Sequence, residues 1–295
     1  MDIHIFFQQL VNGISLGALY ALIAIGYTMV YGVLRLINFA HGDVMMMSTY
    51  FAFYGIAIFA LPWWLSFIIS IILTATLGIL IDIGAYRPIR GAPRISALMT
   101  AIGVSFLLEN LGLVIFGGRP KAFYVPHVFS KIFKVFGIVI PSLSLWIIAI
   151  AVVCLILTFH LVYRTRIGMA MRAISLDMET VKLMGVNVNR VISFTFALGS
   201  SLAAVGGIMW AMKYPQINPL MGIIPGLKAF VAAVLGGIGD VVGAVIGGFL
   251  LGVLEIMIVA IFPTIAGYRD AIAFFLLIFI LLFSPRGILG GGLEV

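Results

Sequence analysis

The chain has 295 residues, of which 63% are hydrophobic and only 9% are charged, and its formal net charge is +7. Soluble domains carry about 25% charged residues, so this composition excludes a protein that is soluble on its own. In a membrane protein basic residues mainly mark the loops that face the cytoplasm, so the positive charge gives no indication of a nucleic-acid partner.

Long stretches without Asp, Glu, Lys or Arg run through the chain, for example from Ile3 to Leu34 and from Val44 to Ile81. About 20 apolar residues cross a bilayer as a helix, and these stretches lack the alternation of a membrane barrel. We therefore predict an all-α polytopic membrane protein, with one membrane domain over residues 1–295 and about eight transmembrane helices. The predicted spans are residues 6–28, 36–58, 62–85, 95–117, 137–162, 190–212, 241–262 and 268–284.

The second predicted span begins with the polar motif INFAHGD, which contains Asn38, His41 and Asp43. We expect an interrupted or kinked helix there, because polar and ionisable groups at membrane depth are costly and usually face a cavity or a partner. Further polar residues at this depth are Glu109, Asn110, Lys228 and Glu255.

These charged residues also have purely structural interpretations. Lys228 can snorkel towards the membrane surface, or it can pair with Glu255 or Glu109. Asp82 is expected to pair with Arg87 or Arg90 near the membrane boundary. The pair Arg269 and Asp270, at the start of the last span, is expected at the membrane interface.

Basic clusters orient the predicted bundle. One cluster consists of Arg87, Arg90 and Arg94, and a second covers residues 164–190. Two spans separate them, so both can face the cytoplasm, with Arg286 on the same side if the segment 222–240 crosses the membrane. The N-terminus and the segment 118–136 are then outside. This outer segment nevertheless contains Arg119, Lys121, Lys131 and Lys134.

The segment from Arg164 to Arg190 is the largest charged interruption of the apolar pattern. We predict two short helices in it. The first contains Gly168, Met169, Arg172, Ala173 and Leu176, with the apolar residues Met169, Ala173 and Leu176 on one stripe. Asp177 is the expected N-cap of the second helix, Gly185 the left-handed residue after it, and Asn187 or Asn189 the cap of the next span. Such a basic amphipathic elbow can dock a soluble partner, or it can lie on lipid headgroups.

The segment 222–240 is apolar but is broken by Pro225 and by Gly236–Gly237, so we predict a half-helix or re-entrant element there. Small residues recur every four positions on either side of it. One stripe is Gly239, Gly243 and Gly247, and the other is Gly199, Ala203, Gly207 and Ala211. Such stripes allow close packing of helices, within this chain or against a second membrane subunit.

Motifs of enzyme chemistry are missing from the sequence. The glycine cluster 236–240 is followed by no Lys-Ser or Lys-Thr pair, so no phosphate-binding loop is present, and the four histidines are scattered. Cys154 is the only cysteine and cannot form an internal disulfide. We expect no catalytic residue, no metal site and no cofactor, and therefore no enzymatic activity of this chain.

Four stretches carry a recognisable pattern: residues 20–43, 86–91, 165–191 and 218–248, with INFAHG and GLKAFVAAVLGGIG as the most specific parts. In this order they resemble the branched-chain amino acid permease family of bacterial ABC importers, and most of all its LivH-type subunits. The resemblance runs from the first predicted span to the seventh and so covers nearly the whole chain.

The resemblance implies a pore-forming subunit of an ATP-driven importer in the bacterial inner membrane. Its partners would be two ABC ATPase subunits, a second related permease subunit, a periplasmic binding protein and membrane lipid. The residues assigned to the ATPase-coupling loop are Gly168, Arg172, Ala173, Leu176, Asp177 and Gly185. The candidates for the translocation path are Asn38, His41, Asp43, Glu109, Lys228, Gly236 and Gly237.

Alternatives remain at this stage. Related permeases carry urea, amides or other amino acids, although leucine, isoleucine and valine are the preferred prediction. A self-sufficient transporter driven by an ion gradient would also contain broken helices and buried acids. A purely structural membrane subunit would bind partners without lining a pore.

Overall fold

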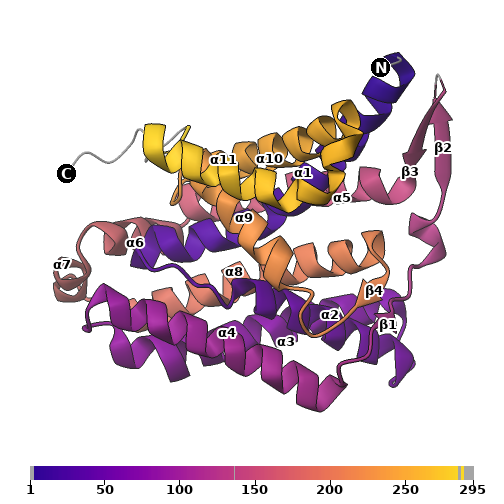
Figure 1. The fold of residues 1–295 in the computed structure, drawn as a ribbon. Helices are drawn as coiled ribbons and strands as arrows, with labels where there is room; N and C mark the ends of the chain where they lie inside the picture. Colours follow the sequence, from indigo (N-terminus) through magenta and orange to yellow (C-terminus); the bar gives the residue numbers. More distant parts are fainter. Residues whose placement is uncertain (1–2, 136, 285–286, 289–295) are drawn as a thin grey trace.

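Helix α1 (Ile3–Leu34) is the most deeply buried long element of a helical bundle (Figure 1). The structure, a computed structural model, describes residues 3–135, 137–284 and 287–288, so Arg286 lies outside the described residues. The other α-helices are α2 (His41–Ala57), α3 (Trp63–Ile81), α4 (Arg94–Phe116), α5 (Ser142–Arg164), α6 (Arg166–Leu176), α7 (Met178–Leu183), α8 (Val188–Lys213), α9 (Ile223–Gly236), α10 (Val241–Ile261) and α11 (Arg269–Phe283).

Short elements connect these helices. A π-helix, η1 (Asp82–Tyr86), and a 3-10 helix, η2 (Arg87–Ile89), follow α3. Two further 3-10 turns are η3 (His127–Phe129) and η4 (Pro263–Tyr268), and the strands are β1 (Lys121–Ala122), β2 (Ile132–Val135), β3 (Ile138–Pro141) and β4 (Gln216–Ile217).

Seven helical segments of the described residues are long and apolar enough to cross a membrane: Ile3–Leu34, Trp63–Ile89, Ile95–Phe116, Ser142–Arg164, Val188–Lys213, Val241–Ile261 and Pro263–Phe283. The predicted class, an all-α polytopic membrane protein, is therefore confirmed. The remaining predicted span, 36–58, corresponds to α2, which has 17 residues and a length of about 26 Å at 1.5 Å per residue.

The first two predicted spans have different bounds from those expected. Helix α1 continues to Leu34, and α2 begins only at His41. Between them Arg35 has a φ of 55°, in the left-handed region that ends a right-handed helix. The expected interruption of the helix is thus present, and it is longer than a kink.

Helix α9 has 14 residues, about 21 Å, which is too short for the hydrocarbon core of a bilayer. Gly237, with a φ of 113°, ends it. Most of its side chains are buried between α1, α2, α10 and α11. This agrees with the predicted broken segment inside the protein.

The outer segment contains β-structure that the sequence pattern did not predict. Strands β2 and β3 form an antiparallel hairpin, so α5 begins at Ser142 and not near residue 137. The side-chain amide of Gln8 donates to the carbonyl oxygen of Val139 at 2.8 Å and accepts from its N–H at 2.7 Å. This pair of hydrogen bonds fixes the hairpin against α1. Figure 1 shows the hairpin at the opposite end of the bundle from α6 and α7, as the predicted orientation requires.

The small-residue stripes pack within the chain. A Cβ atom at Gly199 would lie 3.1 Å from the carbonyl oxygen of Gly26, and one at Gly207 would lie 2.6 Å from that of Met45. On the other stripe, Gly243 and Gly247 lie against the backbone of α9. The interpretation as internal packing is confirmed for these positions, because any side chain there would separate the helices.

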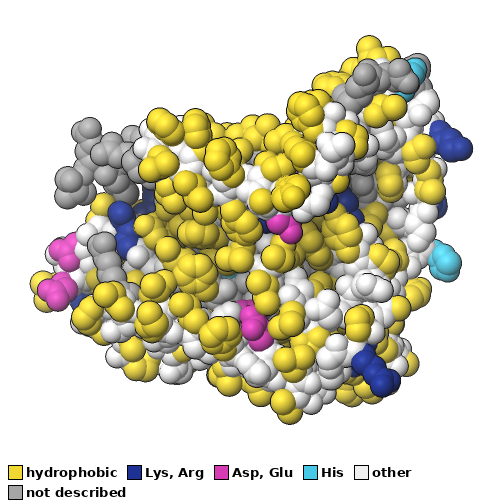
Figure 2. Space-filling view, viewed as in Figure 1, with side chains coloured by type: hydrophobic (Ala, Val, Ile, Leu, Met, Phe, Trp, Pro, Cys, Tyr) yellow, Lys and Arg dark blue, Asp and Glu magenta, His cyan; other side chains and the backbone are white. Residues whose placement is uncertain are grey.

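The outer helices present apolar side chains to their surroundings. In the most apolar window of α1, 94% of the residues are buried, whereas the segment that contains α11 has 6% buried. Figure 2 shows one such face, where hydrophobic side chains dominate and charged ones gather at a few points. These faces are suited to lipid or to a second membrane subunit.

Candidate functional site

Two polar side chains at the break between α1 and α2, those of Asn38 and His41, are buried and hydrogen-bonded. Asn38, 4% exposed, accepts a hydrogen bond of 2.9 Å from the hydroxyl of Tyr86. Nε2 of His41 lies 3.2 Å from the carbonyl oxygen of Ile23. The break is therefore a defined structure, held by side chains from other parts of the bundle.

The start of α2 lies against the start of α9. A Cβ atom at Gly42 would overlap with the carbonyl oxygen of Gly222 and would lie 3.1 Å from Cα of Gly226. We call this contact the α2–α9 crossing. Neither helix has a side-chain cap at its N-terminus, so two short helices begin inside the protein at one point. Paired half-helices of this kind form the sites of several transporter folds.

Two carboxylates lie beside the crossing, that of Asp43 on α2 and that of Glu109 on α4. Asp43 of α2 accepts a hydrogen bond from the hydroxyl of Ser105 on α4. Glu109 is four residues further along α4, so it lies on the same face, one turn away. Glu109 is half-buried, and no side chain of the described residues pairs with it or donates a hydrogen bond to it. It is thus the carboxylate at this depth that remains available.

Lys228 belongs to a buried ion network. Its Nζ lies 2.5 Å from Oε1 of Glu255 and 2.5 Å from Oδ1 of Asp270. Glu255 also pairs with Arg269 and accepts a hydrogen bond of 2.9 Å from Tyr20. The predicted pairing of Lys228 with Glu255 is confirmed, whereas pairing with Glu109 and snorkelling are not observed. Arg269 and Asp270, expected only at the interface, join this network.

Gly236 and Gly237 serve helix packing and helix termination. A Cβ atom at Gly236 would overlap with the carbonyl oxygen of Gly243 on α10. Gly237 takes up the left-handed conformation that ends α9. The structure gives both residues a local reason to be glycine, separate from the predicted role in a path.

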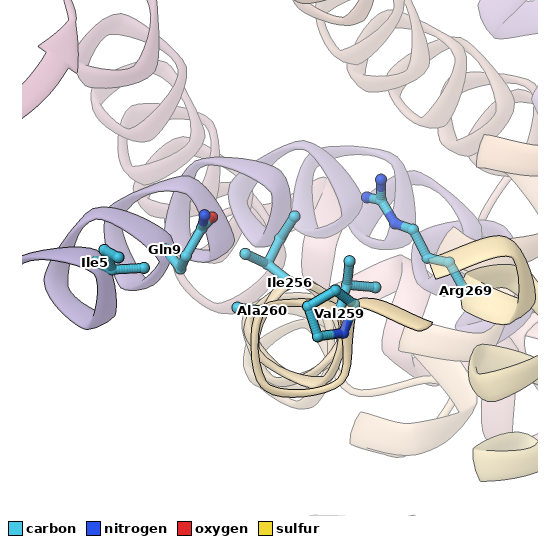
Figure 3. A pocket seen from close by; sticks show the side chains of 7 residues that line it. Ile5, Gln9, Ile256, Val259, Ala260 and Arg269 are labelled. Carbon is cyan, nitrogen blue, oxygen red and sulfur yellow. The ribbon is translucent and has the colours of Figure 1, made fainter. Parts of the chain in front are cut away.

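A surface groove of about 310 Å³ lies elsewhere, between the N-terminal part of α1 and the end of α10 (Figure 3). Its lining residues are Ile5, Gln9, Ile256, Val259, Ala260, Pro263 and Arg269. No residue of the predicted translocation path lines it. Within residues 3–135, 137–284 and 287–288, no three His, Cys, Asp or Glu side chains are grouped as metal ligands.

The elbow, residues 164–190, has the predicted helices and caps. Asp177 accepts hydrogen bonds from the N–H groups of Glu179 at 2.9 Å and of Thr180 at 3.2 Å. Gly185 has a φ of 82°, and Asn187, not Asn189, caps α8. Thr165 caps α6 through the N–H of Gly168, a cap that the sequence pattern did not predict.

The elbow has one apolar face towards the bundle and another towards the exterior. Met171, Ile174 and Val181 are buried. The apolar side chains that are more than half exposed are Met169 at 62%, Leu176 at 62%, Leu183 at 89% and Met184 at 77%, and Ile167 is 44% exposed. Met169 and Leu176 agree with the predicted stripe, on which Ala173 is half-buried. Leu183 and Met184 escaped prediction, although two apolar residues before Gly185, at a helix end outside the membrane, are a usable signal.

Two charged residues of the elbow are engaged within the chain. The guanidinium carbon of Arg172 lies 5.3 Å from the ring centroid of Tyr163, in cation–π contact. The hydroxyl and the N–H of Thr180, together with the N–H of Glu179, stabilise the charged form of Asp177 and lower the pKa of its carboxyl group from the usual 3.8. Asp177 therefore remains an ionised cap at neutral pH.

A second polar cluster lies where α3 meets α8. The carboxylate of Asp82, fully buried, pairs with both Arg87 and Arg90. The sequence predicted one of these partners and the structure has both. Ser193 of α8 donates to the same carboxylate at 2.6 Å, and Asn189 accepts from Arg90 at 2.6 Å. This cluster binds the N-terminal end of α8 to the π-helix η1.

A family model described as the branched-chain amino acid transport system / permease component matches residues 9–281. The permease protein BraD of the high-affinity branched-chain amino acid transport system of Pseudomonas aeruginosa is 42% identical, over 98% of this chain and 97% of that protein. LivH proteins of the same description are 43% identical in Salmonella typhimurium and 42% identical in Escherichia coli K12, each over 97% of this chain and 96% of the relative.

Proposed function

The chain belongs to the branched-chain amino acid transport permease family, and we propose that its elbow, residues 164–190, is where ATP hydrolysis on separate subunits drives it. It is a permease subunit of an ABC importer for branched-chain amino acids. No phosphate-binding loop is present in its sequence, so the energy has to enter through contact with another chain.

The exposed apolar side chains of the elbow support this proposal most directly. Met169, Leu176, Leu183 and Met184 lie outside the candidate membrane spans and are more than half exposed. Burying a side chain of this size contributes about 1.5–3 kcal/mol, so their burial in a groove of an ATPase subunit would supply a stable contact. The surrounding basic residues suit an acidic rim on that partner.

The docking proposal is tested by Leu176→Asp combined with Ala173→Asp. We expect loss of ATPase subunits from the purified assembly and loss of stimulated ATP hydrolysis, because two carboxylates would enter an apolar interface. The matched control is Val128→Asp, at a side chain 47% exposed in η3, at the other end of the chain's bundle. Retention of the ATPase subunits by the elbow variant would contradict docking at this face.

We further propose that the translocation path passes the α2–α9 crossing on its α4 side. Asn38, His41 and Asp43 line the start of α2, and Glu109 supplies the available carboxylate beside them. Lys228 contributes through the ion network that holds α9, and Gly236 and Gly237 through the packing and the end of α9. A half-buried carboxylate at membrane depth is costly against lipid, so Glu109 fits a hydrated path or a polar partner.

Cysteine labelling tests the path. In a Cys154→Ala background, Glu109→Cys is expected to react with a membrane-impermeant thiol reagent applied from the outer side. Val114→Cys is the control on the same helix: this side chain is 82% exposed in the chain, so only lipid or a second membrane subunit can protect it. Equal protection of both positions would place Glu109 away from water and overturn its assignment to the path.

The membrane in which the chain lies and the subunits that surround it are part of the same proposal. We place the chain in the bacterial inner membrane, beside a related second permease subunit, above two ATPase subunits and below a periplasmic binding protein. Uptake of radiolabelled leucine by the reconstituted assembly, with and without this chain, tests the assignment. Uptake that survives without ATP in the presence of an ion gradient would overturn it.

A further inference from the structure

The elbow is joined rigidly to α8. Helix α7 ends at Leu183 and α8 begins at Val188, so only four residues separate them. Asn187 caps α8, and the N–H of Val186 donates back to the carbonyl oxygen of Val181 at 3.4 Å. A displacement of the elbow therefore has to displace the first turns of α8.

The first turns of α8 are in turn fixed to η1. Asn189 and Ser193 are four residues apart and lie on one face of α8. They contact Arg90 and Asp82, and Ser193 also accepts a hydrogen bond of 2.9 Å from Arg87. Because the carboxylate of Asp82 is fully buried, separation of these groups would leave an unpaired charge in the protein interior.

The first and the last residue of the π-helix η1, Asp82 and Tyr86, make side-chain hydrogen bonds to different elements. The N–H of Arg87 donates to the carbonyl oxygen of Asp82, five residues back, which is the wide turn of a π-helix. Asp82 faces α8, while the hydroxyl of Tyr86 donates to Oδ1 of Asn38 at 2.9 Å. Tyr86 is fully buried, with its ring 5.1 Å from that of Phe196 on α8.

Asn38 lies in the break between α1 and α2. Among the described residues, the hydrogen bond from Tyr86 is the only one made by a side chain of residues 35–40. Helix α2 begins three residues later, and its second residue, Gly42, contacts Gly222 and Gly226 at the crossing. A continuous series of contacts thus runs from the elbow through α8 and η1 to the point where α2 and α9 meet.

We propose that Tyr86 and Asn38 are positioning residues, which transmit displacement of the elbow and α8 to the α2–α9 crossing. The inference rests on the proposed docking of ATPase subunits at the elbow. The hydrogen bond joins two packed elements, and such elements move between discrete arrangements instead of deforming gradually. Its loss leaves the ATPase site and the crossing intact but uncouples their movements.

The test uses Tyr86→Phe in the full reconstituted assembly, with leucine uptake and ATP hydrolysis measured together. We expect the amount of leucine transported per ATP hydrolysed to fall about fivefold, because a buried hydrogen bond contributes a net free energy that corresponds to about this factor. ATPase subunits should still co-purify. A change in fold alone would lower both activities in proportion and would leave this ratio unchanged.

Tyr50→Phe is the matched control. Tyr50 is as fully buried as Tyr86, but no group in the described part of the chain accepts a hydrogen bond from its hydroxyl. The same deletion should therefore leave the ratio at the wild-type value. A second pair of variants, Asn38→Leu alone and with Tyr86→Phe, completes a double-mutant cycle, in which the double variant should lose no more than either single one.

The outcomes separate the two proposals. If the wild-type assembly shows no ATP-dependent uptake, the proposed function fails, and this inference fails with it. If the wild-type assembly transports leucine, and Tyr86→Phe transports as much leucine per ATP hydrolysed as Tyr50→Phe does, only this inference is overturned. If Tyr86→Phe does not fold, Ser193→Ala is the alternative variant, because it interrupts the series of contacts at α8. It is expected to lower the amount of leucine transported per ATP hydrolysed in the same way, and an unchanged ratio would overturn the inference.

Discussion

The elbow and the α2–α9 crossing both consist of short helices, but different forces hold them. Helices α6, α7 and α8 have side-chain caps, from Thr165, Asp177 and Asn187. Helices α2 and α9 have none, and they meet through glycine backbones. The elbow is thus specified by residues close in sequence, whereas the crossing exists only when the whole bundle has assembled.

This difference matches the tasks that we propose for the two regions. A locally specified elbow keeps its shape while its exposed face binds another protein. A crossing held by close backbone contact and a few hydrogen bonds can take up a second arrangement when α8 moves. Variants that remove a cap should therefore have smaller consequences than variants that fill the crossing.

The largest effect is expected for Gly42→Ala. The new methyl group would overlap with the carbonyl oxygen of Gly222, so the helices must separate, at a cost of about 2 kcal/mol. Gly103→Ala on α4 is the control, because its methyl group would meet nothing within 4 Å and would raise helix propensity by about 1 kcal/mol. Thermal unfolding in detergent measures both. Equal stability of the two variants would contradict a tight crossing.

A smaller effect is expected for Thr165→Ala, which removes the cap of α6. Loss of an N-cap costs about 1 kcal/mol, and the cost should remain local to the elbow. Hydrogen exchange of the α6 amides should accelerate about fivefold, while the amides of α2 stay unchanged. Thr76→Ala is the control, since that hydroxyl bonds only to its own turn of α3. Faster exchange in α2 would show that the elbow is not independent.

The smallest effect concerns pH. The pKa of Asp177 is lowered from 3.8, so its cap is complete above the unfolded-state value and is lost only as the pH falls through the lower folded-state value. Between about pH 5 and 8 we expect no change in ATPase docking that depends on this group. Asp177→Asn, which keeps an acceptor without titrating, should behave like wild type in this range. A difference that appears within it would contradict the assignment.

Much of the elbow followed from sequence alone. Asp177, Gly185 and Asn187 act within three residues of their own positions, so a short window contains their whole context. The apolar runs predicted the membrane class for the same reason. The hairpin of β2 and β3 was missed, because its fixation depends on Gln8, more than a hundred residues away in the chain.

The candidate path could be predicted only in part. Its polar residues stood out because charge is rare in the apolar stretches, but their partners did not. Glu255 contacts Lys228, Arg269 and Tyr20. Asp82 pairs with two arginines and accepts a hydrogen bond from Ser193 of α8. Tyr86 gave no signal at all, since a buried tyrosine with a partner and one without, such as Tyr50, look the same in sequence.

The sequence by itself determined that the chain enters a membrane, roughly where most of its spanning helices lie, and that Asp177 caps the second helix of the elbow. Only the tertiary structure decided which helices are central. Helices α1 and α11 both belong to segments apolar enough to cross a bilayer, yet 94% of the most apolar window of the first segment is buried and only 6% of that of the second. Lipid tails and a protein interior are equally apolar, so hydropathy cannot separate them. That choice follows from shape: Gly17 of α1 lies against the backbone of α10, where a Cβ atom would be 2.7 Å from Cα of Phe249, so only small residues let the two helices meet.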